Sequence, residues 1–477
     1  MKAKIFFITF CNLLICNLLI SQSITNTLGS SGTFTIKDGS TSFLTLSQTT
    51  GQINILKTLR LENTTNSTTG VIFKGVDRFI HNYGAANTFM GINSGNFTMT
   101  GSFNTALGRQ TLYSNTTGIN NTALGSQSLY SNTTGENNTA LGSQSLYSNT
   151  TGINNTALGS LSLNFNTTGS YNTALGLASL IFNSTGENNT ATGTNSLLYN
   201  TTGSFNAAFG SFALQSNTTS ERNSAFGYQS LTNNTGERNS AFGYQSLSSN
   251  TTGVWNSGFG YQSLNMNTGG VVNSAFGYSS LFSNTTGSNN SAFGYLSLSS
   301  NTTGTNNTGI GYNAQVPSGT ANNQVRIGNT SVTYAGVQVA WTITSDRRWK
   351  SNILNSNLGL SFISKLRPVS YTRNNDESGK NEYGFIAQEI EEVLKSEGVE
   401  NTGMLTVTDE GEYQLRYNDL IAPMIKAIQE LKSENDELKD KLAKFEEMQS
   451  VLAVEIEKLK DNRIKAVNSQ INSPENQ

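Results

Sequence analysis

The chain has 477 residues, a net charge of −2 and a hydrophobic fraction of 35%. It is too long for one ordinary domain and too neutral to bind nucleic acid through phosphates, so we expect several modules and no nucleic-acid partner. With 46 glycines, 4 prolines and abundant Asn, Thr and Ser, the composition would be typical of disorder if these residues were not periodic.

Residues 1–21 have the pattern of a secretory signal peptide. Lys2 and Lys4 precede an apolar run over residues 5–20. The alternative is a membrane anchor, but the run is short and interrupted for a spanning helix. We therefore expect export with cleavage after Ser21, giving a secreted or cell-surface protein whose mature chain has no membrane span.

Both cysteines, Cys11 and Cys16, lie in this first segment. Ile15 precedes Cys16 where a lipoprotein signal needs a small residue, so lipid attachment is not favoured. The mature chain would then contain no cysteine, which excludes disulfides and thiolate metal sites. No cofactor and no metal site is predicted.

Residues 22–86 contain short alternating runs. The runs at 33–36 and 53–56 alternate polar and apolar residues, and Asp-Gly at 38–39 and Thr-Gly at 50–51 supply turns. We predict a small β-rich N-terminal cap, without a visible function of its own.

Glycines at a fixed spacing define residues 87–311. The spacing is 17 residues, with one 16-residue step, and the glycines are Gly91, Gly108, Gly125, Gly142, Gly159, Gly176, Gly193, Gly210, Gly227, Gly243, Gly260, Gly277, Gly294 and Gly311. Such a period is typical of a solenoid. Each unit has two apolar spots and two glycine corners, so we predict strand, turn, strand and turn. Because one such rung is thin for a self-sufficient β-helix, we expect three chains wrapped about a common axis.

Two kinds of residue repeat with the glycines. The position four residues after the glycine is Leu in twelve consecutive units, from Leu112 to Leu298, which predicts an inward-facing ladder. Asn and Thr recur at the corners, where an Asn amide can bond to turn backbone or to the Asn one rung away. The units, written Asn-Thr/Ser-Ala-Leu/Phe-Gly, resemble the β-roll heads of trimeric autotransporter adhesins.

An aromatic row and four acids are the candidate functional features of the repeats. The row, which is Tyr228, Tyr244, Tyr261, Tyr278 and Tyr295, either stacks on a glycan or other cell-surface ligand, or packs between rungs and chains, and we favour packing. The acids are Glu136, Glu187, Glu221 and Glu237, all at one repeat position. A glycosidase needs two carboxylates roughly 5 to 10 Å apart in different environments, so no catalysis is expected here.

The period is lost over residues 312–344, which we expect to form a β-stalk or linker with final strands at 324–329 and 336–340. Charge becomes dense after this segment, and Ser345 lies five residues before Lys350. The chain has one histidine, His81, which is far from Ser345 in the sequence, so a Ser-His-Asp triad would need that distant residue. A Ser-Lys pair is the simpler way to activate the serine, provided that the lysine is neutral.

Four motifs follow in order, namely Ser345-Asp346-Arg347-Arg348-Trp349-Lys350-Ser351-Asn352-Ile353, Leu366-Arg367-Pro368-Val369-Ser370-Tyr371, Tyr383-Gly384-Phe385-Ile386-Ala387-Gln388-Glu389 and Tyr417-Asn418-Asp419-Leu420-Ile421. Together they resemble the intramolecular chaperone of endosialidase family, which closes phage tail spikes and fibres and ends some bacterial surface proteins. The resemblance implies a domain over residues 345–431 that trimerises, guides folding of the β-structure before it, and then cuts itself off.

The resemblance also implies an autoproteolytic serine peptidase. Ser345 would be the nucleophile and Lys350 the general base, and the cleaved bond would be Thr344–Ser345. Asp346 is expected to support the site, while Asn352 either supports it or caps the following helix. Trp349 departs from the family pattern, where a smaller aliphatic residue is common.

Other parts of the C-terminal region are expected to be structural. Residues 384–389 predict a glycine turn and the start of an amphipathic helix through Ile390, Val393 and Leu394. A coiled coil is predicted over residues 418–465, because apolar residues alternate spacings of three and four. Its core positions are Ile421, Met424, Ile428, Leu431, Asn435, Leu438, Leu442, Phe445, Gln449, Leu452, Ile456 and Leu459. We expect a trimer, with Asn435 and Gln449 fixing the register.

The sequence as a whole predicts a secreted, homotrimeric, fibre-like surface protein. Its fold would be a mainly β body of 17-residue repeats, an α+β chaperone domain and a trimeric coiled coil. The alternative is a non-catalytic trimeric adhesin that retains the last domain as a trimerisation clamp. A phage fibre is not favoured, because phage structural proteins assemble in the host cytoplasm and need no signal peptide.

Overall fold

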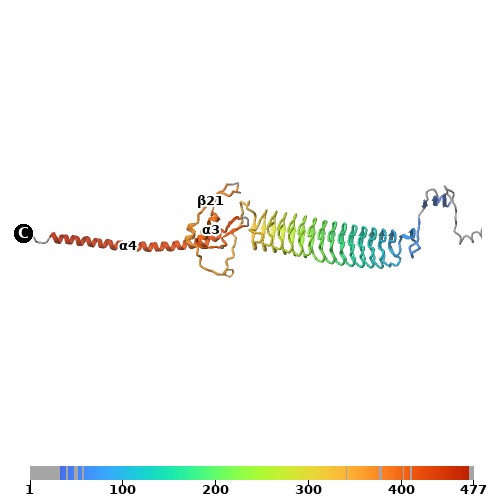
Figure 1. The fold of residues 1–477 in the computed structure, drawn as a ribbon, viewed down its shortest axis with the longest axis horizontal. Coiled ribbons are helices and arrows are strands. Elements are labelled where there is room, and N and C mark those ends of the chain that lie inside the picture. Colours follow the sequence, from blue (N-terminus) through green and yellow to red (C-terminus); the bar gives the residue numbers. More distant parts are fainter. Residues whose placement is uncertain are drawn as a thin grey trace, which may run out of the picture.

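The computed structural model describes residues 33–38, 41–47, 52–55, 59–339, 341–374, 376, 379–400, 402–408 and 411–471. The predicted signal peptide, residues 1–21, lies outside these residues. A long solenoid occupies the middle of the molecule, followed by a small mixed region and one long helix (Figure 1). In the part of the chain that is described, no helix is long and apolar enough to cross a membrane. The predicted mainly β body and the α+β region after it are confirmed.

The first described element is a three-stranded antiparallel sheet. Its strands are β1 (Thr33–Asp38), β2 (Thr41–Ser47) and β3 (Ile53–Ile55), in the order β1-β2-β3. The predicted run at 33–36 lies in β1 and residues 53–55 of the second run form β3, while residue 56 lies outside the described residues.

One short strand from every rung stacks in parallel on the next, starting with β6 (Thr88–Met90). The strands that follow are β7 (Thr105–Leu107), β8 (Thr122–Leu124), β9 (Thr139–Leu141), β10 (Thr156–Leu158), β11 (Thr173–Leu175), β12 (Thr190–Thr192), β13 (Ala207–Phe209), β14 (Ser224–Phe226), β15 (Ser240–Phe242), β16 (Ser257–Phe259), β17 (Ser274–Phe276), β18 (Ser291–Phe293), β19 (Thr308–Ile310) and β20 (Val325–Ile327). The stack thus runs one rung past residue 311.

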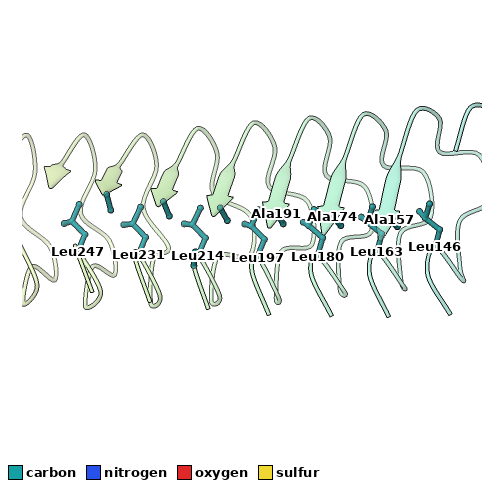
Figure 2. Close-up of a cluster of buried hydrophobic side chains, with 14 of the residues drawn as sticks. Leu146, Ala157, Leu163, Ala174, Leu180, Ala191, Leu197, Leu214, Leu231 and Leu247 are labelled. Atoms are coloured by element: carbon teal, nitrogen blue, oxygen red, sulfur yellow. The ribbon is translucent and has the colours of Figure 1, made fainter. Parts of the chain in front are cut away.

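The strands pair in exact repeat register, so that Ala157 lies beside Ala140 and Ala174. In each strand from β6 to β19 the middle residue is buried and its two neighbours face outward, as in β9, β10 and β11. The leucines of the predicted ladder, from Leu112 to Leu298, are all 0% exposed. Figure 2 shows part of this ladder, from Leu146 to Leu247, beside the buried alanines. The inward-facing leucine ladder is confirmed.

The second strand that we predicted for each rung is absent. The residues around each ladder leucine form a turn, and the leucine itself has left-handed backbone, for example φ 49° at Leu129 and 50° at Leu146. Left-handed backbone is costly for a residue with a Cβ. The chain adopts it because the turn directs an apolar side chain into the core within a rung of only 17 residues.

Each chain closes its own rungs. The leucine, alanine and asparagine ladders are fully buried within one chain, so a rung needs no second chain to cover its core. The association of three chains about a common axis stays a prediction. The core is narrow but continuous, because every rung covers the apolar surface of its two neighbours.

Two ladders of buried asparagines bind neighbouring rungs together. In one, the Asn138 side-chain amide donates to Gly152 O at 2.9 Å and to Asn121 Oδ1 at 3.2 Å. In the other, Asn149 Nδ2 donates to Asn132 Oδ1 at 2.8 Å. Both bonding modes expected for Asn therefore occur. They satisfy buried polar groups that would otherwise destabilise so thin a core.

The rung between Gly227 and Gly243 is one residue shorter than the others, and the missing residue is at one corner. Most rungs carry Asn-Thr-Thr-Gly there, but this one has only Asn234-Thr235-Gly236. Asn234 Nδ2 donates to Gly236 O at 2.7 Å, two residues on instead of three. Strands β14 and β15 consequently keep the repeat register, and the ladder continues unbroken.

An antiparallel hairpin covers the first rung. Its strands are β4 (Ile72–Lys74) and β5 (Asp77–His81), and β5 pairs with β6. The Arg78 guanidinium donates to carbonyls of Asn93, Ser94 and Gly95, which face no preceding rung. Strands β4 and β20 lie at opposite ends of the stack and do not pair, so the sheet is open (Figure 1).

His81 is buried beneath this hairpin. Its Nδ1 accepts from the Tyr83 backbone N–H at 3.3 Å, so Nε2 carries the proton and donates to Ser94 O at 2.8 Å. The ring also lies 4.8 Å from the rings of Phe89 and Phe97. Burial lowers the pKa of His81, and the neighbouring Arg78 charge acts in the same direction.

The region after the solenoid contains short elements around a small core. They are η1 (Arg347–Trp349), α2 (Leu360–Lys365), β21 (Val369–Tyr371), β22 (Glu382–Gly384), α3 (Ala387–Ser396), β23 (Leu405–Val407), β24 (Tyr413–Leu415), η2 (Tyr417–Leu420) and α4 (Ile421–Ile471). Strands β21 and β22 form one antiparallel pair, and β23 and β24 another. The hydrophobic core of this region consists of Leu358, Phe362, Ile390, Leu394, Met404 and Leu420. The final strand that we predicted at 336–340 is absent from its described residues, 336–339.

Helix α4 joins this region through its first turns and then extends alone (Figure 1). The Glu430 carboxylate accepts a hydrogen bond from Leu360 N, at the start of α2, and this bond lowers the pKa of Glu430. Every residue from 431 to 471 is exposed in the single chain. The predicted coiled-coil partners are therefore not part of this structure.

Candidate functional site

Ser345 and Lys350 lie side by side at the junction between the solenoid and the C-terminal region. Lys350 Nζ donates a hydrogen bond to Ser345 Oγ, and the two atoms are 2.7 Å apart. Both residues are exposed in the single chain. This distance is within the reach expected for a nucleophile and the base that activates it.

One turn of 3-10 helix brings the two residues together. In η1 the backbone N–H of Trp349 donates to Asp346 O, and that of Lys350 donates to Arg347 O, both at 3.1 Å. Because a 3-10 turn advances by three residues, it folds Lys350 back toward the residue before the turn. The five-residue spacing of serine and lysine thus has a simple geometric basis.

Asp346 stabilises this turn and does not bond directly to Ser345 or Lys350. Its Oδ1 accepts from Arg348 N at 2.8 Å, as a helix N-cap does, and its carboxylate pairs with the Arg348 guanidinium at 2.7 Å. The hydrogen bonds from Arg348 lower the pKa of Asp346. Asp346 therefore shapes the backbone between Ser345 and Lys350, and Arg348 is a partner that we did not predict.

Asn352 lies just after the turn with left-handed backbone, at φ 53°. The next helix, α2, has Gly359 as its N-cap, so Asn352 does not cap it. Thr344, on the other side of the predicted scissile bond, is exposed.

Residues of the other three motifs contact one another. The Arg367 guanidinium forms an ion pair with Glu389, and the Tyr417 hydroxyl accepts from Phe385 N at 3.1 Å. Gly384 ends strand β22 instead of forming the glycine turn that we expected. It lies against the Tyr417 hydroxyl, where a Cβ would not fit. The amphipathic helix predicted after it is α3, which buries Ile390 and Leu394.

Residues 345–399 match the family model of the chaperone of endosialidase. The match begins at Ser345 itself and includes the η1 turn, Lys350 and the Arg367–Glu389 pair. This family is one of self-cleaving peptidases. No curated protein and no solved structure is detectably similar to the chain.

The solenoid that precedes the matched segment carries a row of tyrosines on its surface. The tyrosine row continues to Tyr312, and neighbouring rings from Tyr228 onward stack with centroids 4.9 to 5.5 Å apart. Neighbouring rings therefore cover each other's faces, leaving edges and hydroxyls to solvent. This arrangement favours packing between rungs over stacking on sugar rings.

Glu221 pairs with Arg222 at 3.1 Å on the surface. Among the described residues, no group of His, Cys, Asp and Glu has the arrangement of a metal site.

Proposed function

We propose that this chain is a secreted homotrimeric fibre whose chaperone of endosialidase segment guides folding of the solenoid and then releases itself at the Thr344–Ser345 bond. The observation that carries the proposal is the hydrogen bond between Ser345 and Lys350, located where the solenoid ends and the family match begins. A self-cleaving segment separates from its cargo at such a boundary.

The reaction would be an acyl shift followed by hydrolysis. Neutral Lys350 takes the proton from Ser345 Oγ, which attacks the carbonyl carbon of Thr344. The C–N bond breaks, and the proton passes from Lys350 to the departing amine of Ser345. Water then hydrolyses the resulting ester, giving a Thr344 carboxylate and restoring the Ser345 hydroxyl.

A lysine acts as a base only when it is neutral, and removal from water favours the neutral form. Lys350 is exposed in the single chain. In this proposal the assembled trimer covers it, so that cleavage follows assembly. A chain that cleaved before trimerising would lose its chaperone too early.

Self-association is supported by helix α4. It has 51 residues, about 76 Å of helix, and most of it contacts no other element. Its apolar heptad residues are 43 to 62% exposed, for example Met424 and Leu438. A lone helix with such a stripe is marginal in water, whereas parallel copies bury the stripe against each other.

The chaperone role is supported by contact with the end of the solenoid. The β23–β24 hairpin contributes Thr408, Glu412 and Gln414 to a cavity that Val316 and Arg326 line from the last rungs. A fixed last rung supplies the edge on which the next one stacks, and solenoid folding propagates from such a start.

Cleavage is tested with variants of residues 22–477. We expect the wild-type chain to be cleaved, and Ser345→Ala, Lys350→Ala and Lys350→Arg to stay whole, because arginine keeps the charge but cannot act as a base. Ser351→Ala, which removes a neighbouring exposed serine, is the matched control and should be cleaved. Denaturing gels give the cleaved fraction, and light scattering gives the mass of the assembly. A wild-type trimer that stays whole would identify the segment as a retained trimerisation clamp.

A further inference from the structure

The single histidine of the chain, His81, lies in strand β5, which pairs the N-terminal hairpin with the first rung. Histidine is the side chain whose ordinary pKa falls between about pH 5 and about pH 8. Among the buried side chains of the described residues, His81 is the only one that titrates, and it is 4% exposed. In mildly acidic solution, a change of charge in the interior of the solenoid therefore starts at this one position.

Both ring nitrogens of His81 are bonded in a way that only the neutral ring allows. Nδ1 accepts a hydrogen bond from the Tyr83 backbone N–H at 3.3 Å, while Nε2 donates to Ser94 O at 2.8 Å. A protonated ring carries a hydrogen on each nitrogen and can only donate. Protonation therefore breaks the bond from Tyr83 and turns two N–H groups toward each other.

A cation already binds the same carbonyl as the histidine. Arg78 Nε donates to Ser94 O at 3.3 Å, so the guanidinium and the imidazole share one acceptor. If His81 is protonated, two positive charges lie side by side beneath the hairpin. Like charges repel more strongly in a partly buried site than in water.

The surroundings of His81 do not offset this repulsion. On the strands and rungs packed around it, the other charged or titratable side chains are Lys74, Asp77, Tyr83 and Tyr113. Asp77 is the only carboxylate among them, and its Oδ1 accepts from Asn93 Nδ2 at 3.0 Å. Burial and the Arg78 charge lower the pKa of His81, although the bond to Ser94 O acts in the opposite direction.

We propose that His81 is an acid-sensitive latch, which holds the β4–β5 hairpin on the first rung while its ring is neutral and opens strand β5 from β6 when the ring is protonated. The other rungs stay folded, because their buried side chains do not titrate. Opening uncovers the edge of β6, on which another strand can pair. The latch lies at the opposite end of the solenoid from Ser345, so the inference depends on neither the proposed trimer nor cleavage (Figure 1).

Hydrogen exchange followed by mass spectrometry tests the latch in the chain of residues 22–477. Two backbone bonds report on it directly, since Gly91 N donates to Phe79 O at 2.7 Å and Asn93 N donates to Arg78 O at 3.1 Å. After correction for the intrinsic effect of pH on exchange, we expect peptides within residues 78–93 to exchange at least about tenfold faster at about pH 4.5 than at about pH 7.5. Peptides from internal rungs, such as residues 139–158, should not change.

Two variants assign this acid response to the histidine. His81→Gln keeps one acceptor and one donor but cannot be protonated, so its corrected exchange should be the same at both pH values. Asp77→Asn removes the carboxylate of the same strand and should keep the acid response. Because the chain has one histidine, a ring-labelled sample also gives one NMR signal, whose titration midpoint should coincide with the midpoint of the faster exchange.

The possible outcomes are distinct. Faster exchange in acid that is confined to residues 78–93 and absent in His81→Gln supports the latch. Equal exchange of the wild type at both pH values, or an acid response that persists in His81→Gln, overturns it. A response that spreads equally over the internal rungs, or a histidine signal that titrates at a different pH from the exchange, also overturns it, whether or not the glutamine variant folds.

Discussion

The leucine ladder predicts a sharp difference between two leucines of neighbouring rungs. Leu146 is fully buried, whereas Leu158 faces outward from strand β10 and is 36% exposed. Leu146→Ala removes a buried side chain from a core that cannot collapse, because the rungs above and below keep their own leucines. We expect a loss of about 2 to 5 kcal/mol in the free energy of unfolding.

Leu158→Ala is the matched control, with an expected loss of about 1 kcal/mol. The left-handed backbone of Leu146 does not affect the comparison between Leu and Ala at that position, since both carry a Cβ. Urea denaturation of the Ser345→Ala chain, followed by circular dichroism, gives the two losses. Equal losses at the two positions would refute the assignment of these leucines to opposite faces.

Three further predictions concern the solenoid, each read from denaturation midpoints. Gly176→Ala should cost about 2 kcal/mol or more, since φ is +133° and a Cβ would lie 2.7 Å from Gly193 O; an unchanged midpoint would contradict this close approach. Asn138→Asp should lower the free energy of unfolding by at least about 2 kcal/mol at pH 7, because it replaces the amide that donates to Gly152 O with a buried carboxylate, and by less at pH 4. A variant as stable as the wild type at pH 7 would exclude this hydrogen bond. Burial lowers the pKa of His81, so as pH drops the unfolded chain binds the proton before the folded chain does, and the stability of the solenoid should fall below about pH 6.5. His81→Gln should remove the share of this loss that comes from the histidine. A loss of the same size in His81→Gln would show that other groups cause it.

The periodic features of the fold were visible in the sequence. Leu112 and its repeats predicted the core ladder, because a position that recurs every rung has one environment throughout. The backbone of those leucines was not predictable in the same way. A short apolar spot fits a strand or a turn equally well, and only the geometry of a closed 17-residue rung decides for the turn.

The sequence predicted which two residues lie together at the candidate site but not what supports them. Ser345 and Lys350 were assigned as nucleophile and base from their spacing and from the family resemblance, and their Oγ and Nζ atoms lie 2.7 Å apart. The Arg348 bond to Asp346 depends on the 3-10 turn, which leaves no periodic pattern in three residues. The hydrogen bonds from Arg78 to the first rung were not predicted. The carbonyls that it binds have no preceding rung to pair with, and this can be recognised only once the solenoid is folded.

The most direct test of the account is the mass of the mature chain after expression, measured by denaturing mass spectrometry. We predict two fragments, one ending at Thr344 and one beginning with a free amine at Ser345, and a single whole chain for Ser345→Ala. Fragments that meet at another bond, or cleavage that survives Ser345→Ala, would contradict self-cleavage by the Ser345–Lys350 pair.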